Sequence, residues 1–232
     1  MIERYSITAS NTAVAERFAV DVPDFYKPHY NAAPTQLLPV ITNDNPEGIS
    51  TFYWGTSPEW LKNKAPSEKV INVRGETIHE KTALKRAMMK MRCLIPADGF
   101  YAWKRIGKKT MIPYRFVLQK QEMFSIAGIW EEFEDENGTL VHTFMMLTVP
   151  PNELVAVVDQ RMPVILDKKG EKIWLKKESE EPELISLLSS YPAAEMNFYT
   201  VSPRIGEANL DVPSLITPTP PADQFGNLTL FD

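Results

Sequence analysis

The chain has 232 residues, of which 44% are apolar and 24% are charged, a balance typical of a soluble globular protein with a sizeable core. No apolar run approaches the roughly 20 residues that a membrane-spanning helix needs, and the polar N-terminus is unlike a signal peptide. The single cysteine, Cys93, excludes an internal disulfide. We therefore expect a cytoplasmic protein, and the net charge of −5 argues against non-specific coating of nucleic acid.

The N-terminal part of the chain predicts two helices and three strands. Ser10 is placed to cap a short helix that extends to residue 20. Apolar and β-branched runs predict strands at residues 37–42, 49–54 and 69–73. The clearest helix is predicted over residues 76–91, and the apolar residues that recur at helical spacing there are Ile78, Leu84, Ala87, Met88 and Met91.

The stretch RCLIPADGFYAWK, at residues 92–104, predicts a β-hairpin. An apolar strand at residues 93–96 precedes a tight turn at residues 97–99, and an aromatic strand follows at residues 100–103. Such a hairpin can present its alternate side chains to a pocket. Cys93 lies on the apolar strand and is expected to be a buried core thiol.

The C-terminal part predicts strands first and short helices afterwards. Strands are predicted at residues 114–119, 124–130 and 142–148, and Asn137-Gly138 is a strong hairpin turn between the last two. Short helices are predicted at residues 152–158, 172–177 and 183–189, and a last strand at residues 196–201. We expect an α+β fold that is mainly antiparallel β with a few peripheral helices. One domain would span residues 1–218, followed by a proline-rich C-terminal tail at residues 219–232.

Positive charge is concentrated in one part of the chain. Acids gather elsewhere, at residues 131–136 and 178–183, and the only acid between residues 81 and 109 is Asp98. The cations of this stretch form either a solvated helix and loop or one face that follows a phosphate backbone. They are Lys81, Lys85, Arg86, Lys90, Arg92, Lys104, Arg105, Lys108 and Lys109.

Other chemistries have little support in the sequence. His29, His79 and His142 are isolated, with no second ligand at metal spacing, so we expect no metal. No glycine-rich phosphate loop or dinucleotide fingerprint occurs, so we expect no cofactor. The serines lie in no nucleophile elbow and have no obvious histidine partner.

Eight short motifs occur in an order that resembles the SOS-response-associated peptidase (SRAP) family over residues 1 to about 218. Each motif is weak alone, and the order of all eight carries the resemblance. They are YNAAP at 30–34, WGxxPxW at 54–60, NxRxET at 72–77, the 92–104 stretch, PY at 113–114, AGIWE at 127–131, RMPVIL at 161–166 and VS at 201–202. The resemblance implies a barrel-like fold and capture of abasic sites in single-stranded DNA, in the DNA damage (SOS) response.

The family's reactive groups, as the resemblance implies them, are missing from this chain. A cysteine at position 2 would close a thiazolidine with the aldehyde of the abasic sugar, and a glutamate and a histidine would assist proton transfer. These three positions are occupied here by Ile2, Ala102 and Asp159. Isoleucine has no thiol and alanine cannot transfer a proton. Asp159 is either a weak base or a surface or salt-bridged acid near Arg161.

The positions with which the family holds DNA are retained. Arginine and asparagine there would contact phosphate or the lesion sugar, and a proline and a tryptophan would wedge against bases. Trp60 could equally be core packing, as we expect for Trp54 and Trp130, and Arg74 could pair with Glu76 or Glu131. The positions that match the family's DNA-binding residues are Arg4, Pro34, Trp60, Asn72, Arg74, Thr148 and Arg161.

Three functions follow as hypotheses. The first is a monomer that binds single-stranded or gapped DNA, including abasic DNA, in a basic groove without the covalent crosslink. The second is an active crosslinking enzyme or peptidase that uses the amine of Met1 or the carboxylate of Asp159. The third is a scaffold without catalytic activity that binds a protein or small ligand in the old cleft.

Overall fold

A ring of five strands forms the centre of the protein. The computed structural model describes residues 2–55, 70–134 and 137–228. Each strand of the ring pairs with the next, and the pairing of β9 with β10 closes it into a barrel, which leaves no edge inside the ring. In ring order, the strands are β3 (Leu37–Thr42), β4 (Ser50–Trp54), β10 (Leu140–Val149), β9 (Phe124–Glu134) and β6 (Arg92–Ala97).

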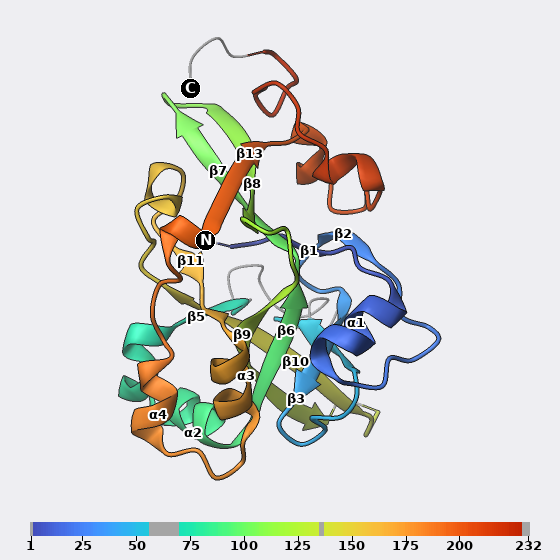
Figure 1. The fold of residues 1–232 in the computed structure, drawn as a ribbon, viewed down its shortest axis with the longest axis vertical. Coiled ribbons are helices and arrows are strands. Elements are labelled where there is room, and N and C mark those ends of the chain that lie inside the picture. The colour runs from blue at the N-terminus through green and yellow to red at the C-terminus, as the bar shows by residue number, and fades with distance from the viewer. Residues whose placement is uncertain (1, 56–69, 135–136, 229–232) are drawn as a thin grey trace.

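Three short strands extend the barrel sheet. β5 (Asn72–Arg74) runs parallel to β10, and β11 (Met162–Pro163) pairs antiparallel with the same strand. β12 (Ile165–Leu166) pairs with β9. The pairings of the described strands are mainly antiparallel, and the helices are few and peripheral. The predicted α+β class with a mainly antiparallel, barrel-like sheet is therefore confirmed (Figure 1).

A second sheet of five strands lies above the barrel in Figure 1. It contains the long hairpin of β7 and β8, whose strands pair from Phe100–Phe116 to Ile106–Thr110. The sequence predicted the edges of its last strand well, because residues 196–201 are the expected and 196–200 the observed strand. In spatial order, the strands are β13 (Met196–Thr200), β8 (Thr110–Leu118), β7 (Gly99–Ile106), β1 (Tyr5–Ile7) and β2 (His29–Ala32).

The predicted hairpin at residues 92–104 was wrong. β6 pairs with β3 and β9 in the barrel, whereas β7 pairs with β1 and β8 in the second sheet. The chain crosses between the sheets at Asp98, whose carboxylate accepts hydrogen bonds from Ser6 Oγ (2.7 Å) and Thr8 Oγ1 (2.6 Å) and from the Arg115 guanidinium (2.8 Å). Ser6 and Arg115 are buried, and these charge-assisted hydrogen bonds fix the place where the chain crosses.

The predicted helix at residues 76–91 is broken into two. A 3-10 helix spans Gly75–Glu80, Lys81 is extended, and α2 spans Thr82–Lys90. At 100° per residue, Ile78 and Ala87 would lie on opposite sides of one continuous helix. Because both side chains are buried, the break lets each turn bury its own apolar face.

The remaining helices cover the periphery. Ser10 caps α1 (Asn11–Phe18) as predicted, by accepting from the backbone N–H of Ala13. α3 (Lys168–Leu175) begins before the predicted residue 172, because Asp167 caps it, and α4 (Glu181–Ser186) has a capping box. The predicted helix at 152–158 is only a 3-10 turn. The 3-10 helices of this part are Val155–Val157, Ala193–Glu195, Pro203–Gly206 and Pro213–Ile216.

Alternation along β7 separates two apolar clusters. Phe100 and Ala102 belong to the large core between the sheets, whereas Tyr101 packs on the other face with Val201 and Ile205. Cys93 is fully buried in the large core, as predicted, and burial raises the pKa of its thiol. Trp54 and Trp130 are also core residues, as predicted. Among the described helices, none is long and apolar enough to cross a membrane.

Arg92 is a core residue and cannot belong to a phosphate-binding face. Its side chain is fully buried and donates to four backbone carbonyls, at distances of 2.5–2.9 Å. Met88 and Met89 supply two of them near the end of α2, and Trp174 and Lys176 supply two at the end of α3. A cation there satisfies the free carbonyls of both helix ends.

Candidate nucleic-acid interface

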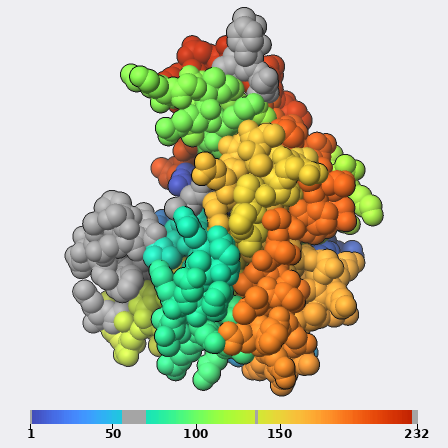
Figure 2. Space-filling view, turned by 90° about the vertical axis from the view of Figure 1, so that its left-hand side faces the viewer, coloured from blue at the N-terminus to red at the C-terminus, as the bar shows by residue number. Residues whose placement is uncertain are grey.

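The N-terminal residues lie in a hollow on the side of the molecule. Figure 2 shows this hollow between the β7–β8 hairpin, in green, and the segment that contains α2, in teal. The N-terminal residues, in blue, are visible inside it. The structure therefore places the family positions near the chain start at a concave surface and not on a flat face.

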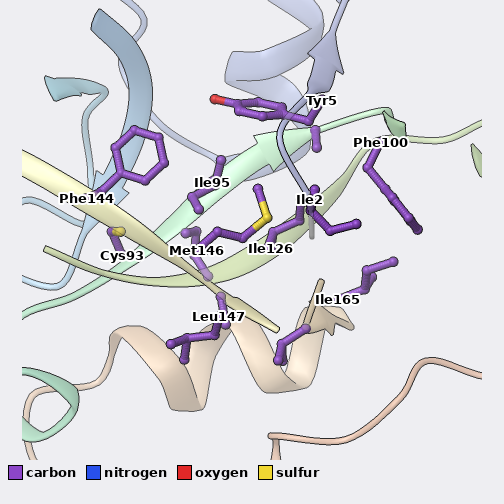
Figure 3. Close-up of a cluster of buried hydrophobic side chains, with 14 of the residues drawn as sticks. Ile2, Tyr5, Cys93, Ile95, Phe100, Ile126, Phe144, Met146, Leu147 and Ile165 are labelled. Carbon is purple, nitrogen blue, oxygen red and sulfur yellow. The ribbon is translucent and has the colours of Figure 1, made fainter. Parts of the chain in front are cut away.

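Ile2 is part of the core. Its side chain is fully buried among apolar residues such as Ile126 and Met146 (Figure 3). Its carbonyl accepts a hydrogen bond from Asn72 Nδ2 at 2.7 Å. The backbone at position 2 is thus fixed by a residue of β5, while the side chain offers no reactive group.

Ala102 is buried as completely as Ile2. It lies opposite Tyr114 in the β7–β8 ladder, and both alanine and tyrosine belong to the large core. Two of the three positions that resemble reactive residues of the family therefore carry apolar side chains in a region from which water is excluded. General acid–base chemistry needs an ionisable group within hydrogen-bonding reach of its substrate, and neither side chain supplies one.

Asp159 faces a different environment. Its Oδ1 atom accepts a hydrogen bond from the backbone N–H of Arg161 at 3.0 Å. The residue also lines a cavity of about 420 Å³ beside the chain start. The described residues that line this cavity are Glu3, Arg4, Trp103, Met111, Asp159, Gly206 and Gln224.

Strand pairing brings four of the predicted DNA-binding residues together. β10 lies between β5 and β11. Its residue Thr148 therefore pairs with Arg74 of β5 on one side and with Pro163 of β11 on the other. Arg161 directly precedes β11, and Asn72 begins β5. Residues separated by almost ninety positions in the chain thus meet at one end of the barrel sheet.

Arg161 is held by acceptors on two neighbouring elements. Its guanidinium forms a two-pronged ion pair with Glu76, whose Oε2 atom lies 2.9 Å from one terminal nitrogen. The same nitrogen donates to the Thr148 carbonyl at 2.6 Å and to Thr148 Oγ1 at 3.0 Å. The hydrogen bond from Arg161 holds the pKa of Glu76 below its ordinary value. The sequence suggests Arg74 as a partner for Glu76, whereas the structure shows Arg161. No local pattern reveals this, because β10 and β11 must first pair to bring Arg161 near Glu76.

Arg74 is exposed and has a different surrounding from Arg161. Within the described part of the chain, no ion pair or side-chain hydrogen bond holds its guanidinium. It adds to the positive field that lowers the pKa of Glu76. The alternative of a structural ion pair with Glu76 or Glu131 is therefore not observed, and the guanidinium is accessible to a ligand.

Three of the predicted residues also hold a buried polar atom that has no hydrogen-bond partner among the described residues. These atoms are the Nε of Arg4, the Oδ1 of Asn72 and the Nε of Arg161. Burial lowers the pKa of Arg4. Native proteins satisfy nearly all buried polar groups, and atoms of the same kind occur elsewhere in the described chain, on Tyr5, Asn31, Ser125 and Thr219.

The wedge positions are described only in part. Pro34 is half-buried in the turn between β2 and β3, where Thr35 has a φ of 72° and donates to the Trp54 carbonyl. Trp60 lies outside the described residues. The basic stretch of residues 81–109 also divides, because α2 and the β7–β8 hairpin lie at opposite ends of the molecule in Figure 1 and Arg92 is buried.

Comparison with known proteins identifies the class of this fold and site. The profile of the SOS response associated peptidase (SRAP) family matches residues 1–208. The abasic site processing protein YoqW of Bacillus subtilis is 36% identical over 93% of this chain and 99% of its own length. YoaM, an abasic site processing protein of the same organism, is 37% identical over 87% of this chain and 91% of its own length.

A solved structure has the same fold as this chain. A crystal structure of a protein from Bacteroides thetaiotaomicron superposes with a TM-score of 0.81 at 25% identity, covering 93% of this chain and 99% of the other. The chain belongs to the SRAP family.

Proposed function

We propose that this protein binds single-stranded or gapped DNA at abasic sites without forming the covalent crosslink that the family resemblance implies. The observation that carries the proposal is the convergence of Arg4, Asn72, Arg74 and Arg161 beside a hollow in which two of the three chemistry-bearing positions are apolar. Relatives named abasic site processing proteins support the choice of DNA lesion. Arginine suits phosphate because its planar fork donates two parallel hydrogen bonds.

The proposed absence of a crosslink rests on the groups at positions 2 and 102. A thiazolidine needs an amine and a thiol on the same residue, and Ile2 has no thiol. The buried Ala102 side chain has no ionisable group that could transfer a proton. Binding energy from the retained arginines remains available, so we assign the protein a binding role in lesion recognition.

A second candidate is an enzyme that uses Asp159. The carboxylate lies at a cavity that also contains Arg4, which is where a sugar aldehyde held by the arginines would come close. This candidate predicts a DNA product or a covalent adduct whose formation stops in Asp159→Asn. The non-covalent role predicts binding without either product.

The salt dependence of binding tests the proposed role. We expect the affinity for single-stranded DNA with an abasic-site analogue to fall as salt rises, and the logarithmic slope to shrink by about 0.7 in Arg74→Ala, because one phosphate contact is lost. Arg161→Ala is expected to reduce the slope similarly and to weaken binding further, since it also frees Glu76. Fluorescence anisotropy at several salt concentrations measures both quantities.

Lys169→Ala is the matched control, because Lys169 is an exposed cation on α3. It should leave the slope unchanged. Undetectable binding by the native protein, or binding that does not respond to salt, would exclude the proposed role.

Glu76 competes with DNA for Arg161, which gives a prediction in the opposite direction. The Glu76 carboxylate is charged at neutral pH, as a glutamate ordinarily is, so the ion pair must be opened before phosphate can bind. Glu76→Gln is therefore expected to bind DNA about two- to five-fold more tightly, the range of an exposed ion pair. A titration at fixed salt measures the change.

Glu131→Gln controls for the change in net charge, because Glu131 is exposed on β9. Equal gains in both variants would mean that only net charge matters. Weaker binding by Glu76→Gln would mean that Glu76 orients Arg161 toward DNA.

A further inference from the structure

The C-terminal residues return to the second sheet and attach to the β7–β8 hairpin. Thr219 N donates to the Thr200 carbonyl at 3.0 Å, and Thr200 Oγ1 donates to the Thr219 carbonyl at 2.6 Å. The Gln224 amide then donates to the Lys109 carbonyl at 2.6 Å and accepts from Met111 N at 2.8 Å. Gln224 thus holds this segment against the tip of the hairpin.

A tight turn at residues 223–227 presents Phe225 to solvent. The Asp223 carboxylate accepts hydrogen bonds from the backbone N–H groups of Phe225 and Asn227, both at 2.9 Å. Gly226 takes a φ of 83°, which glycine adopts without strain. The Phe225 ring is 77% exposed, more than any other large apolar residue of the described chain. The turn therefore holds an aromatic ring in water at a defined place.

The surroundings of Phe225 distinguish it from an isolated exposed side chain. The neighbouring Gln224 lines the same cavity as Arg4 and Asp159. The hairpin that Gln224 grips carries the exposed cations Lys108 and Lys109, and in the described ranges neither has an ion-pair partner. Phe225 therefore directly follows the residue that contacts the Lys109 backbone, and proteins bind single strands with exposed aromatic rings that stack on bases and cations that follow phosphates.

We propose that Phe225 stacks on a base of the single strand that flanks the abasic site, and that Lys108 and Lys109 bind the adjoining phosphates. This inference rests on the proposed function and extends its interface beyond residues 1–208, which the family profile matches. The partner we assign is DNA, because Phe225 directly follows Gln224, which lines the same cavity as Arg4. Stacking requires only the face of a base, so the contact is independent of sequence.

The test compares Phe225 variants for binding to a single strand that carries an abasic-site analogue. Because the ring is exposed, Phe225→Ala should fold normally, and its affinity should fall roughly 5- to 150-fold, the range for losing one stacked base, with the salt slope unchanged. Phe225→Trp should restore the affinity. Lys108→Ala with Lys109→Ala should instead reduce the salt slope by about 1.4, for two phosphate contacts on a single strand.

A fluorescent base analogue locates the contact. 2-Aminopurine placed at successive positions beside the lesion should change its fluorescence at one position with the native protein and not with Phe225→Ala. Phe25→Ala is the matched control, because Phe25 is 66% exposed and lies in the loop before β2. Its affinity should equal that of the native protein.

The outcomes separate the two proposals. If the native protein binds DNA and Phe225→Ala binds equally well, the inference fails while the proposed function stands, and the exposed ring would belong to a protein contact instead. If the native protein does not bind DNA under any salt condition, the proposed function fails and the inference with it.

Discussion

The triple variant Ile2→Cys, Ala102→Glu, Asp159→His is expected to form a heat-stable adduct with abasic single-stranded DNA, whereas the native protein forms none. When the chain is expressed from Met1, a small residue at position 2 allows Met1 to be removed, which exposes an amine and a thiol together. The amine condenses with the sugar aldehyde and releases water. The thiol then adds to the resulting C=N bond, and its proton passes to nitrogen. A denaturing gel run after heating measures the adduct.

The fold explains why the three changes belong together. Glu at position 102 would enter the core in which Ile2 is buried, and a lone carboxyl group there has no polar partner at position 2. We therefore expect Ala102→Glu alone to destabilise the protein and to form no adduct. The same triple variant with Ile2→Ser is the control, because it allows Met1 to be removed but supplies no thiol. A heat-stable adduct with the native protein would overturn the proposed non-covalent role. A heat-stable adduct with this control would show that the thiol at position 2 is not required.

Arg92→Met is expected to lower the free energy of unfolding by about 3–5 kcal/mol. The substitution keeps most of the apolar stem, yet it leaves four carbonyls at two helix ends without this donor, two of them buried and two part-buried. Burial lowers the pKa of Arg92, and the guanidinium nonetheless stays charged at neutral pH because its ordinary pKa is so high. Urea unfolding followed by circular dichroism measures the change.

Two further variants serve as controls for this measurement. Arg92→Lys keeps a charge but has a compact ammonium in place of a planar fork, so it should recover only part of the loss. Arg105→Met changes an exposed arginine on β7 and should alter stability by less than about 0.5 kcal/mol. A loss below about 1 kcal/mol in Arg92→Met would show that water reaches these carbonyls.

The sequence predicted local structure well and partners poorly. The strands at 37–42 and 196–201 were found because apolar and β-branched runs are visible locally. The predicted hairpin at 92–104 failed because the two strands are adjacent in the chain but belong to different sheets, and only distant pairings decide that. The prediction that Arg92 belongs to an exposed basic stretch was wrong for a similar reason, because the carbonyls that bind it come from two separate helices.

In the candidate site, too, individual residues could be predicted from the sequence but their partners could not. The resemblance supplied Asn72, Arg74, Thr148 and Arg161, and the strand pairing places them together. The sequence could not reveal that Glu76 holds Arg161, because the two residues meet through β10. It also could not reveal Gln224 at the cavity, because a proline-rich tail has no pattern that shows where it returns.

The sheet crossing at Asp98 has a consequence for how the chain folds during synthesis. Ser6 and Thr8 bind a carboxylate that lies 92 and 90 positions further along, and β1 pairs with β7 in the same region. A nascent chain emerges from its N-terminus, so β1 has this partner only after β7 has left the ribosome. Closing so long a loop is entropically costly and slow. The segment that contains β1 is therefore fixed only after the much later β7 is available, and the hollow around this segment is completed no earlier.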